Sequence, residues 1–154
     1  MSTDSVPLIN AEHAAFMQGG VSISMSSCNA ARIPSVSRAT GCRITSDLRQ
    51  VTIFVIAPHA GNLLDDIRRG GAVAVTFSKP STNRTVQLKG ANAVVTDVAD
   101  NERHIAETYL DAFVEELDPL GHDGNRVRAM FAHAPGDIVA VRVTPCAAFS
   151  QTPG

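Results

Sequence analysis

Short apolar runs with the spacing of β-strands dominate this chain, and strand–helix–strand alternation occurs only once among them. The run QVTIFVIA at 50–57 is β-branched and nearly all apolar, which is typical of a strand buried on both faces. The remaining strands are expected at 21–27, 33–44, 72–78, 84–98 and 137–144. Such an order favours a closed or nearly closed antiparallel barrel over a doubly wound parallel sheet. The expected fold class is therefore mainly β with helices (α+β).

Helical spacing of apolar residues predicts helices at 11–18, 60–71, 100–117 and 126–133. The glycine pairs at 19–20 and 70–71 end the first two. We find no internal repeat or linker, so the 154 residues are predicted to form one domain. Residues 1–10 and 146–154 are expected to be loosely ordered tails.

Charge and composition exclude several classes of protein. With 13 basic and 15 acidic side chains the formal net charge is −2, without the basic stripe of a nucleic-acid binder. The apolar runs are too short to span a membrane, and the first ten residues lack the pattern of a signal peptide. Three widely spaced cysteines and five histidines show no metal-ligand spacing. We therefore expect a cytoplasmic protein without a metal site.

The stretch IPSVSRATGCRI at 33–44 is the most unusual of the expected strands. Strand alternation places Arg38, Thr40 and Cys42 on one face, together with Val36 and Ile44. The other face carries Arg43 and otherwise only small side chains, at 35, 37, 39 and 41. A face so bare of bulk could lie against a large flat ligand, and the arginines could meet a negative charge.

A second feature bears on this interpretation. The buried strand at 50–57 leads into a helix whose first amides, near Asn62 and Leu63, could bind an anion. The alternative role of Arg38 is structural, in an ion pair with Asp65 or Asp66.

In RTVQLKG at 84–90, Thr85, Gln87 and Lys89 share one strand face. This face is either simply solvated or able to hydrogen-bond the edge of a heteroaromatic ring through the Gln87 amide. No catalytic triad is present. His59 and His133 fall in expected loops without a partner to orient them, and we interpret both as solvated.

These features, in this order, resemble the pyridoxamine 5′-phosphate oxidase-like family of FMN-binding split barrels. The likeness extends from about Phe16 to Thr144 and depends on PSVSRATGCR, VTIFVIAPHAGNLLDDI, AVAVTFS and RTVQLKGANA, followed by the long helix and the last strand. The resemblance implies a six-stranded antiparallel split β-barrel. It also implies a homodimer with two FMN molecules in clefts between the subunits.

The resemblance further implies which residues contact the flavin. The position of Arg38 contacts the FMN phosphate, and the backbone of Ala39, Thr40, Gly41, Cys42 and Arg43 lines the flavin. Ala57 and Pro58 border the ring, and the strand that carries Thr85, Gln87 and Lys89 contacts its edge.

Two departures from the family limit the function. Many members carry an Arg-Lys pair that grips the phosphate, where this chain has Asn62 and Leu63. Neutralisation of the phosphate would then depend on Arg38, with Lys89 or Arg84 as helpers. The C-terminal arginine and histidine motif that binds pyridoxal phosphate is replaced by AFSQTPG, so pyridoxine phosphate oxidase activity is rejected.

Three hypotheses of function remain. The first is a small FMN-dependent oxidoreductase acting on an unknown substrate, with the deazaflavin F420 as the less favoured cofactor. The second is a non-catalytic flavin- or haem-binding module that serves as sensor or store. The third is a dimer whose pocket no longer binds a cofactor.

Overall fold

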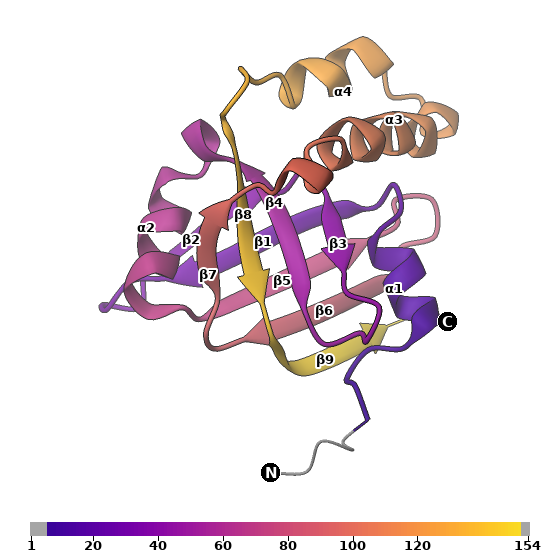
Figure 1. Ribbon diagram of the computed structural model, residues 1–154. Coiled ribbons are helices and arrows are strands. Elements are labelled where there is room, and N and C mark those ends of the chain that lie inside the picture. Colours follow the sequence, from indigo (N-terminus) through magenta and orange to yellow (C-terminus); the bar gives the residue numbers. More distant parts are fainter. Residues whose placement is uncertain (1–5, 152–154) are drawn as a thin grey trace.

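The computed structural model describes residues 6–151, which form two antiparallel sheets and four α-helices (Figure 1). The larger sheet has five strands in the order β2 (Pro34–Arg38), β1 (Ser22–Cys28), β5 (Val73–Ser78), β6 (Thr85–Gly90) and β9 (Pro145–Gln151). The smaller has four, in the order β3 (Cys42–Ile44), β4 (Val51–Ile56), β8 (Ile138–Val143) and β7 (Val94–Asp97). The described strands thus form two separate sheets rather than one closed barrel.

The helices lie around the sheets. They are α1 (Ala11–Met17), α2 (Gly61–Gly70), α3 (Ile105–Leu117) and α4 (Gly124–Met130), with short 3₁₀ turns η1 (Ala57–His59), η2 (Asp100–Glu102) and η3 (Asp118–Leu120). Figure 1 shows α2 beside the β1–β2 hairpin, and α3 and α4 together at the opposite side of the sheets. Among the described residues, no helix is long and apolar enough to cross a membrane.

Local signals in the sequence set the helix ends. The Asn10 side chain accepts a hydrogen bond of 2.8 Å from the amide of His13 and so caps α1. Helix α2 ends at Gly71, whose φ of 75° is a left-handed conformation that glycine adopts without steric cost. The predicted helices at 11–18 and 60–71 are therefore confirmed within a residue of each end.

The hydrophobic core lies between the two sheets and under α2 and α3. All six residues of β4 are buried, as the nearly all apolar run predicts. In β1 and β5 buried residues alternate with partly exposed ones, so each strand turns one face to the core. The largest side chains that are almost fully buried include Phe54, Phe77, Met17, Ile23 and Met25.

The stretch 33–44 is not one strand, and this corrects the sequence prediction. It divides into β2 and β3, which belong to different sheets. The crossing occurs at Ala39, Thr40 and Gly41, where the amide of Thr40 bonds to the Phe54 carbonyl at 2.7 Å. Because the chain turns here, residues predicted to share one strand face have opposite exposure in β2 and β3. Val36 is 70% exposed, whereas Cys42 is buried.

Two other expectations also change. The long strand at 84–98 divides after Gly90 into β6 and β7, again in different sheets. A side-chain carbon on Gly90 would lie 2.6 Å from a Val143 methyl group, so the bend requires glycine. The tail predicted to be irregular forms β9, which pairs with β6. Residues 6–10 contain no helix or strand, while 1–5 and 152–154 lie outside the described residues. With these divisions, nine strands are described instead of six.

Candidate functional site

One line of cross-strand neighbours runs over the outer face of the five-stranded sheet. Arg38 on β2 pairs with Ser24 on β1, Ser24 with Thr76 on β5, and Thr76 with Gln87 on β6. We call these four residues the cross-strand row. Neighbouring strands lie about 4.8 Å apart, so Arg38 and Gln87 are separated by about 14 Å. A cation thus stands at one end of the row, an amide at the other, and small hydroxyl side chains between them.

The side chains of the row are held by local hydrogen bonds. The Arg38 guanidinium donates to the Ser22 hydroxyl at 3.1 Å, and the Gln87 amide donates to the Thr76 hydroxyl at 3.3 Å. Thr85 and Lys89 lie on the same outer face, as the alternation predicts, while Val86 and Leu88 are buried. In the next position along β6, the Lys89 ammonium lies 5.8 Å from the centre of the Phe149 ring.

The structural role expected for Arg38 as the partner of Asp65 or Asp66 is wrong. Asp65 pairs with Arg68 and Asp66 with Arg69, both within α2. Burial raises the pKa of the Tyr109 phenol, and the Arg38 charge opposes part of that rise. Among the described residues, the Arg38 guanidinium is thus bonded to the Ser22 hydroxyl and not to a carboxylate of α2.

The crossing from β2 to β3 turns most of its groups inward. The side chains of Ala39, Thr40 and Cys42 are buried. The amide of Ala39 donates to the Ile23 carbonyl at 2.9 Å, and the carbonyl of Gly41 accepts from the amide of Phe54 at 3.0 Å. Burial raises the pKa of the Cys42 thiol, so this thiol stays protonated and is a poor nucleophile at neutral pH.

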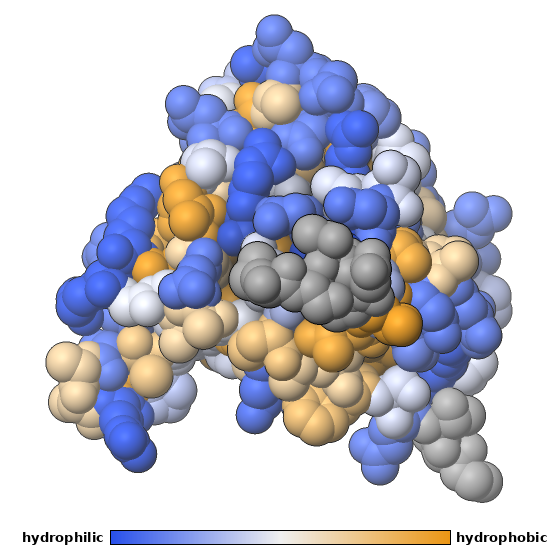
Figure 2. Space-filling model, turned by 60° about the horizontal axis from the view of Figure 1, so that its bottom comes forward, coloured by the Kyte–Doolittle hydropathy of each residue, from blue (hydrophilic) through white to orange (hydrophobic). Residues whose placement is uncertain are grey.

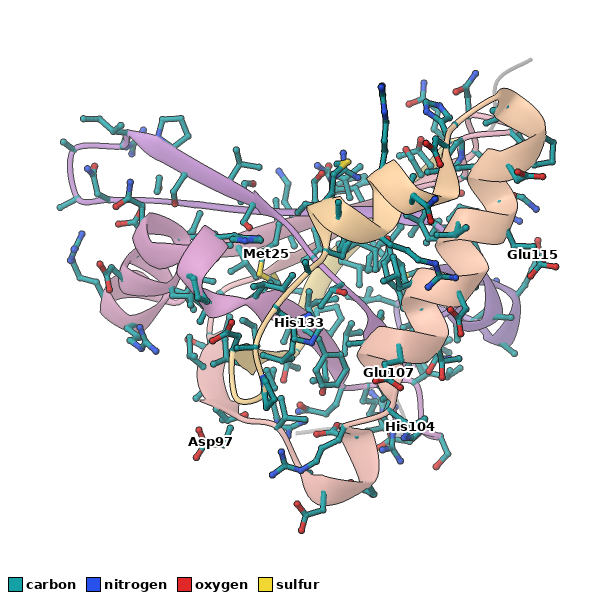
Figure 3. The ribbon with its side chains drawn as sticks, turned by 90° about the horizontal axis from the view of Figure 1, so that it is seen from above. Met25, Asp97, His104, Glu107, Glu115 and His133 are labelled. Carbon is teal, nitrogen blue, oxygen red and sulfur yellow. The ribbon has the colours of Figure 1, made fainter. Side chains whose placement is uncertain are left out.

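Arg43 is the exposed member of this segment and borders a cavity of about 320 Å³, here called the Arg43 pocket. The cavity is lined by Gln18, Cys42, Arg43, Asn101, His104, Ile105, Thr108 and Tyr109. The Gln18 side chain accepts a hydrogen bond of 2.9 Å from the amide of Ile44 and so occupies part of the free edge of β3. Figure 3 shows His104 and Glu107 at the start of α3, beside this region.

The remaining predicted residues gather at the corner between β4 and α2. Ala57 and Pro58 form the start of η1, and the amide of Ala57 donates to the Asp137 carbonyl at 2.8 Å. Asn62 and Leu63 lie in the first turn of α2 and border a cavity of about 530 Å³, here called the α2 pocket. This pocket is lined by residues 34–36 of β2 but not by Arg38.

The predicted residues are therefore not brought together at a single place within the described chain. Arg38, Thr85, Gln87 and Lys89 share the outer sheet face, residues 39–43 form the crossing, and the other four lie at the α2 corner. Sequence reasoning missed Ser24 and Thr76 as the middle of the cross-strand row. Their positions on alternating strands were visible, but the pairing of β1 with β5 was not.

The two histidines considered as acid–base groups, His59 and His133, are not members of the cross-strand row. His59 and His133 are exposed, as expected for solvated residues. The Nδ1 atom of His133 lies 2.9 Å from the Phe131 carbonyl, and Figure 3 shows His133 apart from His104. No group of three or more histidine, cysteine or acidic side chains within residues 6–151 could hold a metal ion.

Comparison with known proteins identifies the fold. No protein-family model and no curated protein matches the chain. Among solved structures, an F420 reductase shares 12% sequence identity over 92% of this chain and 98% of its own, with a TM-score of 0.58. A pyridoxamine 5′-phosphate oxidase-related FMN-binding protein from Nostoc punctiforme shares 10% identity over 98% of this chain and 86% of its own, with a TM-score of 0.56. The chain has the pyridoxamine 5′-phosphate oxidase-like fold. A putative pyridoxamine 5′-phosphate oxidase from Lactobacillus delbrueckii matches similarly, at 11% identity over 96% of this chain and 97% of its own, with a TM-score of 0.57.

The fit of an FMN differs between the two ends of β2. The cross-strand row offers a guanidinium for a phosphate, small side chains for a flat ring system and an amide for its edge. The first turn of α2 offers no basic side chain, and the buried carboxylate of Asp66 borders the same pocket. The residues of the row fit a flavin phosphate, and those of the α2 pocket do not.

Proposed function

We propose that this protein is a flavin-binding oxidoreductase that holds FMN along the cross-strand row. The supporting observation is the order of chemistry in that row, from the Arg38 cation through Ser24 and Thr76 to the Gln87 amide. A bound flavin supplies hydride or electron transfer. The chain itself binds and orients the cofactor, with Lys89 and Thr85 beside the row.

A second copy of the chain is part of the proposal, because the row lies on an open sheet face. Val36 and Phe149 stand near the two edges of that face and are 70% and 54% exposed. Apolar side chains of this size at a sheet surface are typical of an interface between subunits. We therefore expect a homodimer of split barrels whose paired sheet faces exclude water from the flavin.

One observation favours a second candidate, a non-catalytic flavin-binding module. The described histidines belong to loops and helices, not to the sheet face that carries the row: those at 59, 104, 122 and 133 are exposed, and His13 in α1 is half-buried. A sensor or store needs no acid–base group there, whereas many flavin enzymes place one beside the ring.

The visible spectrum of freshly purified protein tests both candidates. Flavin bands, or binding of added FMN followed by fluorescence quenching, support the proposed cofactor. A Soret band would replace it with haem, and a spectrum with no chromophore and no FMN binding would reject the proposal. Turnover of NADH or NADPH with an artificial electron acceptor then separates the enzyme from the module.

A matched pair of glutamine variants tests the position of the flavin. Gln87→Ala should weaken FMN by about 2- to 12-fold, the usual effect of one lost hydrogen bond. The control Gln151→Ala changes the same residue type on β9. Gln151 pairs with Thr85 and lies outside the row, so this variant should leave FMN affinity unchanged. Equal effects of the two variants would exclude the row as the binding site.

A further inference from the structure

A cavity between α1, α3 and the β5–β6 hairpin lies away from the cross-strand row. Its volume is about 350 Å³, within the range of pockets that hold small organic ligands. We call it the α1–α3 cavity. Figure 1 shows the three elements that surround it on the same side of the molecule, at the right of the view. The cavity is lined by Ala15, Phe16, Gly19, Gly20, Val21, Lys79, Ala112, Glu115 and Glu116.

Contacts between the three elements hold the walls of this cavity in place. The Glu116 carboxylate accepts a hydrogen bond of 2.9 Å from the amide of Ser81, which joins α3 to the hairpin. The Arg84 guanidinium donates to the Glu12 carboxylate at 2.9 Å and lies 4.7 Å from the centre of the Phe16 ring, which joins the hairpin to α1. Because the walls are fixed in this way, little ordering is needed when a ligand binds.

Opposite charges line the α1–α3 cavity without meeting each other. Within residues 6–151, the half-buried Lys79 ammonium and the exposed Glu115 carboxylate make no ion pair and no hydrogen bond. Glu116 accepts only from the neutral amide of Ser81, so no cation of the described chain balances its charge. The cavity therefore presents one unpaired cation and two unpaired anions.

These charges select the class of ligand. A simple anion would meet Glu115 and Glu116, and a simple cation would meet Lys79, and such contacts between like charges are unfavourable. An α-amino acid carries both charges. Its carboxylate can pair with Lys79 while its ammonium pairs with the two glutamates, so that every charge has a partner of opposite sign.

The rest of the lining is suited to an apolar side chain. Phe16 supplies an aromatic surface, and Ala15 and Ala112 supply methyl groups. We propose that the α1–α3 cavity binds a free α-amino acid with an apolar side chain. This site goes beyond the proposed flavin function and does not depend on it, since none of its lining residues belongs to the cross-strand row.

Amide chemical shifts of the labelled full chain test this proposal in three titrations. The probes are leucine, isopentylamine, which is leucine without its carboxylate, and isocaproate, which is leucine without its amino group. Leucine should shift the amides of Gly19, Gly20 and Lys79 with an affinity in the millimolar range. Each analogue should bind about 2- to 30-fold more weakly, because it loses one exposed ion pair and brings a like charge to the remaining groups. Tighter binding of either analogue than of leucine, equal binding of all three, or no shifts at all would overturn the proposal.

Two variants should change these affinities in opposite ways. Lys79→Met should weaken leucine and isocaproate by about 1.5- to 5-fold and should not weaken isopentylamine. Glu115→Gln should weaken leucine and isopentylamine by a similar factor and should not weaken isocaproate. Neither side chain has a partner within residues 6–151, so the melting temperature should stay as in the wild type.

Glu107→Gln is the matched control for Glu115→Gln. It makes the same charge change at another exposed glutamate of α3, and Figure 3 shows the two side chains near opposite ends of this helix. Because Glu107 does not line the cavity, this variant should leave all three titrations unchanged. Equal effects of the two glutamate variants, or a uniform loss of all three probes in Lys79→Met and Glu115→Gln, would contradict the paired recognition of the two charges.

Discussion

Arg142 on β8 and Glu102 in η2 join the four-stranded sheet to the segment that begins α3. The two guanidinium nitrogens of Arg142 donate to the two carboxylate oxygens of Glu102 at 3.2 and 3.0 Å. Arg142 also donates to the Thr52 hydroxyl at 2.8 Å, and Glu102 accepts from the amide of Ala99 at 3.1 Å. A paired, bidentate geometry of this kind fixes direction as well as position.

Replacing Glu102 with Gln should lower the free energy of unfolding by about 1–3 kcal/mol at neutral pH, because the Glu102 side chain is only 7% exposed and Arg142 would lose its ionic partner. Urea denaturation measures this loss. The control Asp100→Asn breaks the exposed Arg103–Asp100 contact and should cost much less. Equal losses in the two variants would show that the bidentate pair adds nothing beyond a surface contact.

The same pair should make stability depend on pH in the acid range. Hydrogen bonding from Arg142 holds the pKa of the Glu102 carboxyl below its usual value. A lowered folded-state pKa means that the stabilisation is present above the unfolded pKa, near pH 4.5, and is lost as pH falls through the folded pKa. Wild type should lose more stability than Glu102→Gln between pH 5 and 3, since glutamine does not titrate. Parallel pH profiles of the two proteins would contradict this assignment.

Gly20 joins α1 to β1 at a point of close approach to α3. A side-chain carbon at Gly20 would overlap the Ala112 carbonyl oxygen, which is backbone and cannot rotate away. Gly20→Ala should therefore destabilise the protein by about 1–3 kcal/mol, the usual effect of overpacking. Gly61→Ala is the matched control, because nothing lies within 4 Å of its added carbon at the start of α2. Thermal melts that fall equally for both would disprove the contact.

The proposed dimer face can be tested by adding charge to it. Val36→Asp and Phe149→Asp place carboxylates on the outer face of the five-stranded sheet and should shift the protein to monomer in light scattering coupled to gel filtration. Leu120→Asp is the control, since this residue is 47% exposed but lies in η3, at the far end of α3. A dimer that survives both sheet variants would place the interface elsewhere.

Most of the fold was predictable because its signals are local. The nearly all apolar β4, the alternating β1 and the glycine that ends α2 are each recognisable from a few consecutive residues. The crossing at Ala39–Gly41 was not predictable, because strand alternation continues unbroken through the sequence there. Only the hydrogen bonds of Thr40 and Gly41 to Phe54 move the chain into the second sheet.

The candidate site likewise has parts that the sequence predicts and parts that it does not. The shared face of Thr85, Gln87 and Lys89 follows from alternation alone and is confirmed. The hydrogen-bond partner of Arg38 was not predictable. The sequence allows either Ser22 or a carboxylate of α2 as this partner, and only the packing of the strands and α2 decides between them. The irregular tail was predicted wrongly for a related reason. The sequence of β9 has weak strand character, and its pairing with β6 decides its structure.

The role of Arg38 gives the sharpest test of the proposed cofactor. If its guanidinium meets the FMN phosphate, Arg38→Ala removes a charge-assisted contact of roughly 1.5–3 kcal/mol and should weaken FMN by about 10- to 150-fold. Riboflavin lacks the phosphate and should bind both proteins alike. The melting temperature should change little, because the only hydrogen bond that the Arg38 side chain makes within the described residues is the exposed one to Ser22. Arg68→Ala, which removes a guanidinium from the exposed surface of α2, serves as control and should leave both flavins unaffected. An equal loss of FMN and riboflavin affinity in Arg38→Ala would show that Arg38 does not bind the phosphate and affects only the structure of the sheet face.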